Sequence, residues 1–258
     1  MNVNRPNKTD RRPASAFSLI EMLVVVAIIA LILKVAVPNL RGLSEGHEME
    51  AASRQLIADL SSARASAIGG RCTVAVVFVP RLILTLDLTP YSPAEKQQIL
   101  RLKAGAYTQY ALIAFRRVGD QPGRATPRYL TEWKTLPDKT FIATNKFVNP
   151  PPDLTGFPYG TFPFPFADSP TNMPMPYVAF NYEGRLCNAD VAGSLLSAPE
   201  SSVIPLTRGA ILYTRDEVSG DVLNFNVTET PPGNWTNNPN HVVTEWLTGR
   251  SHLERIEM

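Results

Sequence analysis

The chemically most unusual residue of the sequence is Glu21, a carboxylate inside an otherwise apolar segment. Residues 17–37 are FSLIEMLVVVAIIALILKVAV, and the only other charge is Lys34, close enough to one end for its ammonium to reach a membrane interface. A carboxylate in hydrocarbon costs on the order of 2–3 kcal/mol or more, so we expect Glu21 to have a partner. As a helix the segment is roughly 30 Å long, and the sequence therefore predicts a transmembrane helix over residues 17–37.

Three ordinary interpretations explain this segment less well. A secretory signal peptide carries its small-residue cleavage box after the apolar run, whereas Ala14-Ser15-Ala16 precedes it. A plain signal anchor accounts for the length but not for Glu21. A buried helix of a soluble domain does not need so long an apolar run.

Residues 16–21, Ala-Phe-Ser-Leu-Ile-Glu, resemble the cleavage and methylation motif of type IV prepilins and type II secretion pseudopilins. That motif has a small residue, usually glycine, then Phe, Thr or Ser, Leu, a branched aliphatic residue and Glu; here Ala16 replaces the glycine. The resemblance implies that a prepilin peptidase removes leader 1–16 and that the new amine of Phe17 is N-methylated. It also implies that Glu21 pairs with this amine on a neighbouring subunit, which offsets the cost of a buried charge.

Charge is divided unevenly between the leader and the remainder. The leader has four basic side chains against Asp10, which leaves 21 of the 25 basic and 22 of the 23 acidic side chains from Phe17 onward. The positive-inside rule then predicts a single pass through the bacterial inner membrane, with membrane lipid around the helix and the globular domain in the periplasm. Because the mature chain is nearly neutral, we do not expect nucleic acid as a partner.

A DNA-binding minor pilin that acts in DNA uptake remains the alternative function. Some members of the resembled subfamily bind DNA through a basic C-terminal segment. In this sequence Arg250, His252 and Arg255 are interleaved with Glu254 and Glu257, which weakens the attraction to phosphates.

Residues 38–70 are predicted to form an amphipathic extension of the helix. Pro38 lacks an N–H, so we expect the helix to bend or melt locally there, and in the resembled family this proline marks a weak point. Arg54, Asp59 and Arg64 lie off the apolar stripe, and Gly69-Gly70 is expected to end the helix. The stripe recurs at helical spacing and suits packing on a sheet: Ala52, Leu56, Leu60, Ala63, Ala67.

Three short segments resemble the H-type minor pseudopilins and related minor pilins. Residues 56–68 contain a Leu…Ala-Arg…Ala-Ile run before a strand. Residues 180–186 resemble a hairpin of that group, and residues 246–250 resemble its final strand.

The rest of the chain has the pattern of an antiparallel β domain. Turn signals such as Pro137-Asp138 and Glu183-Gly184 separate short strand-like runs. The sequence thus predicts an α+β, pilin-like fold, with a long N-terminal helix (transmembrane plus amphipathic) packed on an antiparallel β-sheet globular domain at residues 71–258. The expected strands are 73–79, 109–117, 128–133, 140–143, 177–182, 209–214, 221–227 and 241–247.

Two insertions, near residues 80–108 and 149–176, make this domain longer than a minimal member of the family. In the first, Ser92-Pro93-Ala94-Glu95 is a capping box, which predicts a short helix through about Leu102. The second has nine prolines and five aromatic residues. Two interpretations stay open for it: a long loop whose aromatics pack on the sheet, or a surface that contacts a partner or substrate.

Other candidate sites carry weaker signals. A disulfide between Cys72 and Cys187 and two buried free thiols are both compatible with the sequence. Carboxylates around one turn could hold calcium, but a solvated hairpin explains them better. We predict no enzyme activity, no metal site and no cofactor, because the sequence has no nucleophile–base signature and the histidines lack metal-ligand spacing. The carboxylates are those of Asp216, Glu217 and Asp221, and the histidines are His47, His241 and His252.

Taken together, the sequence predicts a structural subunit, either a minor pseudopilin of a type II protein secretion system or a minor type IV pilin. Its expected partners are the prepilin peptidase, other pseudopilins or pilins, and an inner-membrane assembly platform. Its expected destination is a filament or filament tip.

Overall fold

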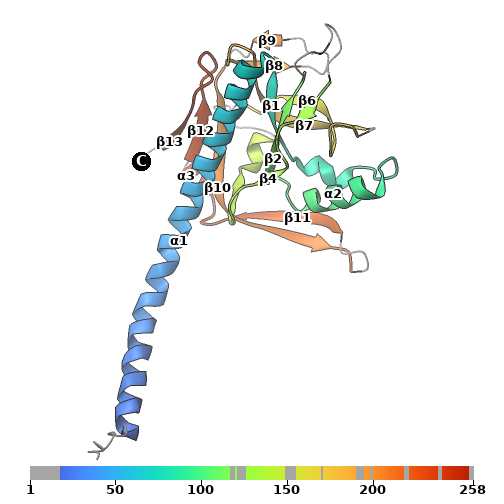
Figure 1. The fold of residues 1–258 in the computed structure, drawn as a ribbon. Helices are drawn as coiled ribbons and strands as arrows, with labels where there is room; N and C mark the ends of the chain where they lie inside the picture. The colour runs from blue at the N-terminus through green and yellow to red at the C-terminus, as the bar shows by residue number, and fades with distance from the viewer. Residues whose placement is uncertain are drawn as a thin grey trace, which may run out of the picture. The chain divides into compact units, whose positions relative to one another are not determined.

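The computed structural model describes residues 18–116, 120, 126–148, 155–169, 171–189, 195–197, 200–217, 221–237 and 240–255. Of residues 35–46, 189 and 195–197 it describes only the secondary structure. The chain divides into two compact units, Met1–Gly46 and His47–Met258. The architecture is α+β, with an N-terminal helix and antiparallel sheets (Figure 1).

Helix α1 (Leu19–Gly70) is 52 residues long and contributes to both units. Its helical assignment is continuous through Pro38, so the predicted local melting is not observed. The helix ends at Gly70, as expected, but the residue that takes the left-handed conformation is Arg71, with φ 47°. The two glycines are therefore the last helical residues and not the left-handed cap.

The first sheet has eight strands, and all of its pairs are antiparallel. The order is β3-β2-β1-β7-β8-β9, with β4 paired to β2 and β6 paired to β7. At its centre Val76 lies opposite both Leu112 and Val178. The strands are β1 (Val74–Phe78), β2 (Gln109–Ala114), β3 (Arg128–Tyr129), β4 (Lys134–Thr135), β6 (Tyr159–Pro163), β7 (Asn172–Phe180), β8 (Leu186–Ala189) and β9 (Leu195–Ser197).

The second sheet has five strands in the order β11-β10-β12-β13, with β5 paired to β10. Its longest strand, β10, pairs with β12 and β5 along its first half and with β11 along its second half. The strands are β5 (Thr140–Ile142), β10 (Ser202–Arg215), β11 (Val222–Glu229), β12 (Asn240–Thr244) and β13 (Ser251–Arg255).

The part of α1 from residue 47 onward packs on these sheets through the predicted stripe (Figure 1). All five stripe residues, Ala52, Leu56, Leu60, Ala63 and Ala67, are 0 % exposed. One hydrophobic cluster joins them to side chains of both sheets, among them Phe78, Tyr110 and Ile204. Burial contributes roughly 1.5–3 kcal/mol for each of the two leucines and less for each alanine, whose small side chain lets the helix lie close to the sheets.

The first insertion contains the predicted short helix, α2 (Pro93–Lys103). The capping box is confirmed, because the Ser92 side chain accepts from the Glu95 N–H while the Glu95 carboxylate accepts from the Ser92 N–H. Two 3₁₀ helices, η1 (Arg81–Thr85) and η2 (Thr144–Lys146), and the one-turn α3 (Asn234–Asn237) are the other helical segments described.

The prediction that the second insertion is a long loop is wrong for the residues that the structure describes. Residues 159–163 form β6, which pairs with the first half of β7 as a hairpin. The expected packing of its aromatics on the core is confirmed for Phe157, Phe162 and Phe164, which are buried, whereas Tyr159 and Phe166 are exposed. Residues 149–154 and 170 lie outside the described residues.

The predicted strands correspond to observed ones with shifted ends, apart from two segments. Residues 128–133 hold only the two-residue β3 and part of the turn that follows. Residues 246–250 are not a final strand; they form the turn between β12 and β13, with the Gly249 N–H bonded to the Glu245 carbonyl at 2.8 Å. Three further turn signals of the sequence, at Gly119, Pro122-Gly123 and Ser219-Gly220, lie outside the described residues.

Candidate functional site

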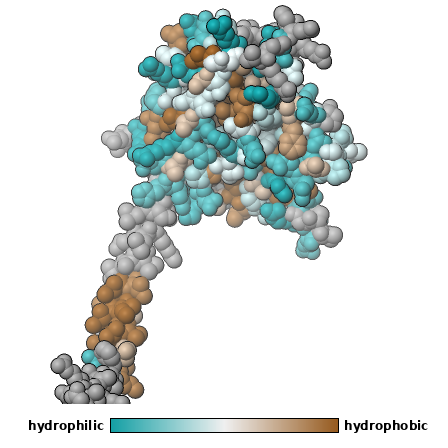
Figure 2. Space-filling view, viewed as in Figure 1, coloured by the Kyte–Doolittle hydropathy of each residue, from teal (hydrophilic) through white to brown (hydrophobic). Residues whose placement is uncertain are grey.

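Residues 19–34 form the first part of α1, which is mainly apolar and whose side chains are all exposed. Figure 2 shows this segment as a continuous hydrophobic surface. Soluble proteins rarely leave so large an apolar surface uncovered, and such surfaces mark contacts with membranes or other proteins. The exposed apolar side chains are Leu19, Ile20, Met22, Leu23, Val24, Val25, Val26, Ile28, Ile29, Leu31, Ile32 and Leu33.

Glu21 lies in the first turn of this helix, where its charge is favoured by the helix dipole. The Ser18 carbonyl opens the helix by accepting from the N–H groups of Glu21 at 3.0 Å and Met22 at 3.2 Å. The side chain of Glu21 is exposed, and no ion pair to it is found in the described part of the chain. Ala16 and Phe17 lie outside the described residues, as does the side chain of Pro38, so their predicted roles in processing and assembly remain predictions.

No helix among the described residues has both the length and the apolar character that a membrane crossing needs. The predicted transmembrane segment, residues 17–37, extends beyond the described side chains at both of its ends.

Comparison with known proteins decides what the N-terminal segment resembles. Residues 11–33 match the family model of the prokaryotic N-terminal methylation motif. This match supports the type IV pilin and pseudopilin family, and with it a structural subunit that a prepilin peptidase processes and that assembles with other pilins. The same motif indicates membrane-anchored assembly. No curated protein and no solved structure matches the chain.

In the globular unit, Arg64 of α1 fastens two turns that lie far apart in the sequence. Its Nε donates to the Gly184 carbonyl at 3.1 Å and to the Thr248 carbonyl at 2.9 Å. A Cβ on Gly249, whose φ is +61°, would lie 2.0 Å from the Gly184 carbonyl oxygen, so only glycine lets the turns approach this closely. The three segments that resemble H-type minor pseudopilins therefore meet around one arginine side chain.

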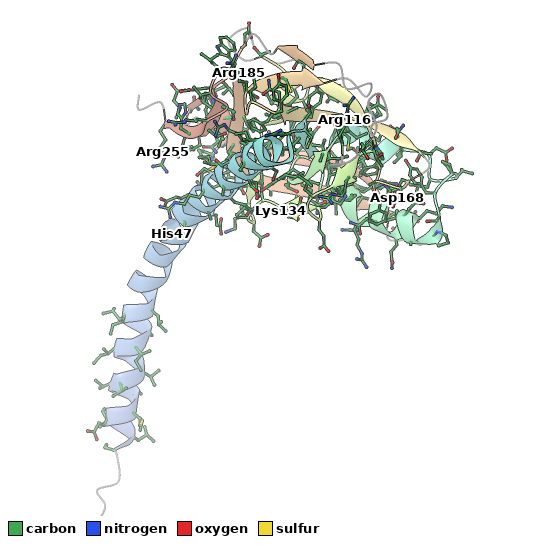
Figure 3. The ribbon with its side chains drawn as sticks, turned by 45° about the horizontal axis from the view of Figure 1, so that its top comes forward. His47, Arg116, Lys134, Asp168, Arg185 and Arg255 are labelled. Carbon is green, nitrogen blue, oxygen red and sulfur yellow. The ribbon has the colours of Figure 1, made fainter. Side chains whose placement is uncertain are left out.

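Asp59 belongs to a second polar contact between α1 and the first sheet. Its carboxylate accepts from the Tyr110 hydroxyl at 2.7 Å and forms an ion pair with Lys134 at 2.5 Å. Lys134 is labelled in Figure 3. Gln55 donates to the same Tyr110 hydroxyl at 3.0 Å. Burial, followed by the hydrogen bond to Asp59, raises the pKa of Tyr110, so the hydroxyl stays protonated. Asp59 was predicted to lie away from the packing face; it is buried because Tyr110 and Lys134 satisfy it.

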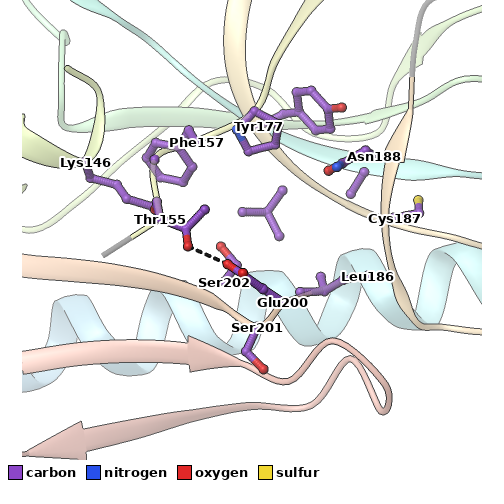
Figure 4. A pocket seen from close by; sticks show the side chains of 14 residues that line it. Lys146, Thr155, Phe157, Tyr177, Leu186, Cys187, Asn188, Glu200, Ser201 and Ser202 are labelled. Carbon is purple, nitrogen blue, oxygen red and sulfur yellow. Dashed lines mark hydrogen bonds between the residues drawn. The ribbon is translucent and has the colours of Figure 1, made fainter. Parts of the chain in front are cut away.

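A cavity of about 500 Å³ lies between the strand pair β7–β8 and the start of β10 (Figure 4). Lys146, only 1 % exposed, lies in its wall, donates to the Thr155 carbonyl and places its Nζ 4.9 Å from the centre of the Phe157 ring. Burial lowers the pKa of this amine to about 8. The lining of the cavity combines apolar with polar side chains, and no described lining residue forms a nucleophile–base pair. The apolar lining residues include Phe157, Val178, Ala179 and Leu186.

The two cysteines are free thiols in the structure. Burial raises the pKa of Cys187 to about 12, and burial also raises the pKa of the half-buried Cys72 against a smaller opposing effect of Arg128. Thiols with a raised pKa stay protonated and are poor nucleophiles and metal ligands.

The remaining sequence candidates do not combine into a site among the described residues. No group of three or more His, Cys, Asp or Glu side chains suited to a metal ion is found there. Asp216 and Asp221 are joined across their hairpin by a backbone hydrogen bond of 2.8 Å. On and beside β13, the basic Arg250 and Arg255 are exposed together with the acidic Glu254, so the mixed charge expected there is present.

Sequence reasoning did not identify Asp59, Arg64 or Lys146 as contact residues. Each acts through a partner at least nine positions away along the chain, so no local pattern marks it. The only signal in the sequence was the resemblance of the segments that contain Arg64, Gly184 and Gly249 to one subfamily.

Proposed function

We propose that this protein is a structural subunit of a pilus-like assembly, either a minor pseudopilin of a type II secretion system or a minor type IV pilin. The observation that carries the proposal is the match of residues 11–33 to the methylation motif, because the described part of that range contains the helical segment 19–33, whose side chains are all exposed. A subunit that functions alone has no use for such a surface, whereas a membrane and a filament core both cover it.

The proposed maturation begins with cleavage after Ala16 by the prepilin peptidase. Hydrolysis of that peptide bond releases leader 1–16 and leaves a free amine on Phe17, which is then N-methylated. In the membrane, residues 17–37 act as a single-pass transmembrane helix, and residues 38–70 extend it to the globular domain in the periplasm. The basic leader stays on the cytoplasmic side until it is removed.

Glu21 is the proposed assembly residue. Once the helix leaves the lipid for a filament, its carboxylate pairs with the Phe17 amine of a neighbouring subunit. An unpaired carboxylate in that environment is costly, so each subunit is held in the register that brings the two charges together. The position of Glu21 in the first helical turn is compatible with this pairing, because it keeps the carboxylate near the N-terminus.

The globular domain is proposed to cap or prime the filament through contacts with other subunits and with the inner-membrane assembly platform. The meeting of the three H-type-like segments at Arg64 supports assignment to the H-type minor subfamily. Nothing in the described geometry favours the DNA-uptake alternative, since basic and acidic side chains are mixed at the C-terminal strand.

Replacing Glu21 tests the proposed pairing. We expect Glu21→Ala to be cleaved after Ala16 as in the wild type but to enter filaments at least about tenfold less, because the Phe17 amine of its neighbour loses its partner. The measurement is the amount of protein in the sheared filament fraction relative to the processed protein in the membrane.

Lys34→Ala is the matched control, since it also removes one charge from the apolar helix but not the one that pairs with the amine. It should be processed and incorporated like the wild type. Normal incorporation of Glu21→Ala would contradict the pairing.

A further inference from the structure

The two insertions meet at a cleft of about 730 Å³ on the globular unit. Helix α2 of the first insertion provides one wall, and the turn after β6 of the second insertion provides another. The insertions are also joined directly, since the side chain of Ser169 in the second insertion forms a hydrogen bond with the Glu95 carboxylate in the first. This bond, followed by the capping bonds of Ser92, lowers the pKa of Glu95. The residues that line the cleft are Gln98, Arg101, Leu102, Gln109, Tyr129, Leu130, Thr131, Glu132, Trp133, Pro165 and Phe166.

Aromatic rings on one side of the cleft are held rigidly. Tyr129 and Trp133 lie 5.6 Å apart between ring centres, and Trp133 also packs edge-on against Phe164 at 5.7 Å. The Tyr129 hydroxyl donates to the Pro163 carbonyl at 2.8 Å, and the Trp133 indole N–H donates to the Pro165 carbonyl at 3.1 Å. Their polar atoms are thus already engaged, and the rings offer apolar faces to a ligand.

The polar groups of the cleft are planar and balanced in charge. Gln98 and Gln109 supply amides, and the single guanidinium of Arg101 is matched by the single carboxylate of Glu132. The Oε1 atom of Gln109 is buried and has no hydrogen-bond partner, while its Nε2 donates to the Thr135 hydroxyl at 3.1 Å. Because this oxygen is buried, it does not contact a ligand in the cleft, and the partly exposed amide there is that of Gln98.

We propose that this cleft binds a neutral saccharide. A sugar ring has apolar C–H faces that stack on aromatic rings, and its hydroxyls are the donors and acceptors that amide, guanidinium and carboxylate groups pair with. The volume lies in the range of small-ligand sites, which is about 300–1,000 Å³.

Two other ligand classes fit the cleft less well. A nucleic acid or other polyanion would need net positive charge, and Arg101 is offset by Glu132. A proline-rich peptide docks on aromatic grooves whose Tyr and Trp side chains donate to its carbonyls. Here the Tyr129 hydroxyl and the Trp133 N–H are already used within the chain, so the aromatic residues have no such donor left. The saccharide proposal does not depend on the proposed assembly function, so either can fail without the other.

Isothermal titration of the full chain in a detergent that contains no sugar tests the proposal. The probes are cellohexaose, chitohexaose and maltohexaose, together with a proline-rich decapeptide and heparin. We expect at least one of the three oligosaccharides to bind. We expect two variants each to weaken that binding at least fivefold. Phe166→Ala removes an exposed ring at the cleft, and Gln98→Ala removes a partly exposed amide.

Tyr182→Ala is the matched control, because Tyr182 is an exposed aromatic residue on a different turn. The variant should bind the oligosaccharide with the same affinity as the wild type. Thermal unfolding of each variant confirms that Phe166→Ala and Gln98→Ala are folded. The proposal is overturned if none of the oligosaccharides binds, if binding is unchanged in both cleft variants, or if only the peptide or heparin binds and the cleft variants weaken it.

Discussion

Residues 19–34 and residues 47–70 are assigned to the same helix, yet their side chains have opposite surroundings. In the first stretch every side chain is exposed, including a dozen large apolar ones. In the second, one stripe is fully buried, and the exposed positions carry small, polar and charged residues, among them Arg54 in its ion pair with Glu50. The second stretch packs on the sheets of its own chain.

This contrast shows that the two stretches serve different kinds of contact. A helix that is apolar on all sides cannot be satisfied by packing one face on a domain, whereas an amphipathic helix can. The same helix therefore combines a segment whose apolar side chains are left exposed with a segment whose contacts are supplied by the globular domain. Mutations should separate the two functions.

The largest effect on stability is expected for Leu56→Ala, which truncates a fully buried side chain at the centre of the stripe. The free energy of unfolding of the globular unit should fall by about 2–5 kcal/mol because a cavity is left behind. Urea unfolding of the full chain in detergent, followed by near-UV circular dichroism, measures it.

Val26→Ala is the matched truncation in the exposed stretch, and it should change the same quantity by less than about 0.5 kcal/mol. Equal losses in the two variants would erase the distinction between the stretches.

Lys146→Met should remove a pH dependence from the stability of the globular unit. Burial lowers the pKa of Lys146 to about 8 from an ordinary 10.5, so between these values the unfolded chain binds more protons than the folded one. The contribution of this residue to the free energy of unfolding therefore rises with pH across that window. The free energy of unfolding of Lys146→Met minus that of the wild type should therefore fall by about 2–3 kcal/mol from pH 8 to pH 10.5.

Subtracting the wild type at each pH removes the effects of other groups, such as the thiols, that titrate in the same window. Lys139→Met is the matched substitution at an exposed position. A constant difference for Lys146→Met would show that its amine is not desolvated.

A smaller effect is expected for Arg64→Met, which keeps the aliphatic length of the side chain but loses the guanidinium. Two carbonyls, those of Gly184 and Thr248, lose their donor, at a cost of about 1–2 kcal/mol. Arg54→Met, whose ion pair with Glu50 is exposed, should cost under about 0.5 kcal/mol. Hydrogen exchange at the Gly184 and Gly249 turns of Arg64→Met would show whether the loss of stability is local. Exchange rates there equal to those of the wild type would contradict the hydrogen bonds from Arg64.

The sequence was sufficient where structure depends on local patterns. The stripe from Ala52 to Ala67 was predicted from helical spacing, and all of its members are buried. The capping box at Ser92 and Glu95 was predicted from four adjacent residues, and both of its hydrogen bonds form. In each case the deciding interactions lie within one helix or along one helical face.

The proline-rich second insertion was mispredicted because prolines usually end strands. Pro174 and Pro176 lie within β7, at positions whose missing N–H groups would point away from β6. Strand β1 pairs with β7 only from Tyr177 onward, so no ladder hydrogen bond is lost there. The tolerance of these prolines depends on where a distant strand ends, which no local signal reveals.

The cleft between the insertions was beyond sequence reasoning for a similar reason. Its walls come from α2, β2 and the turns near Trp133 and Phe166, which only the tertiary fold brings together. The sequence did indicate a second function for the aromatic segment, as a surface that contacts a partner or substrate. It gave no means of placing Phe166 opposite Gln98 and Arg101.

The mature N-terminus tests the central claim most directly. Purified protein from cells with an active prepilin peptidase should be digested and its N-terminal peptide identified by mass spectrometry. The account predicts a peptide that begins at Phe17 and carries one methyl group on its amine. A mature protein that still begins at Met1, or that is cut after the apolar segment, would contradict it.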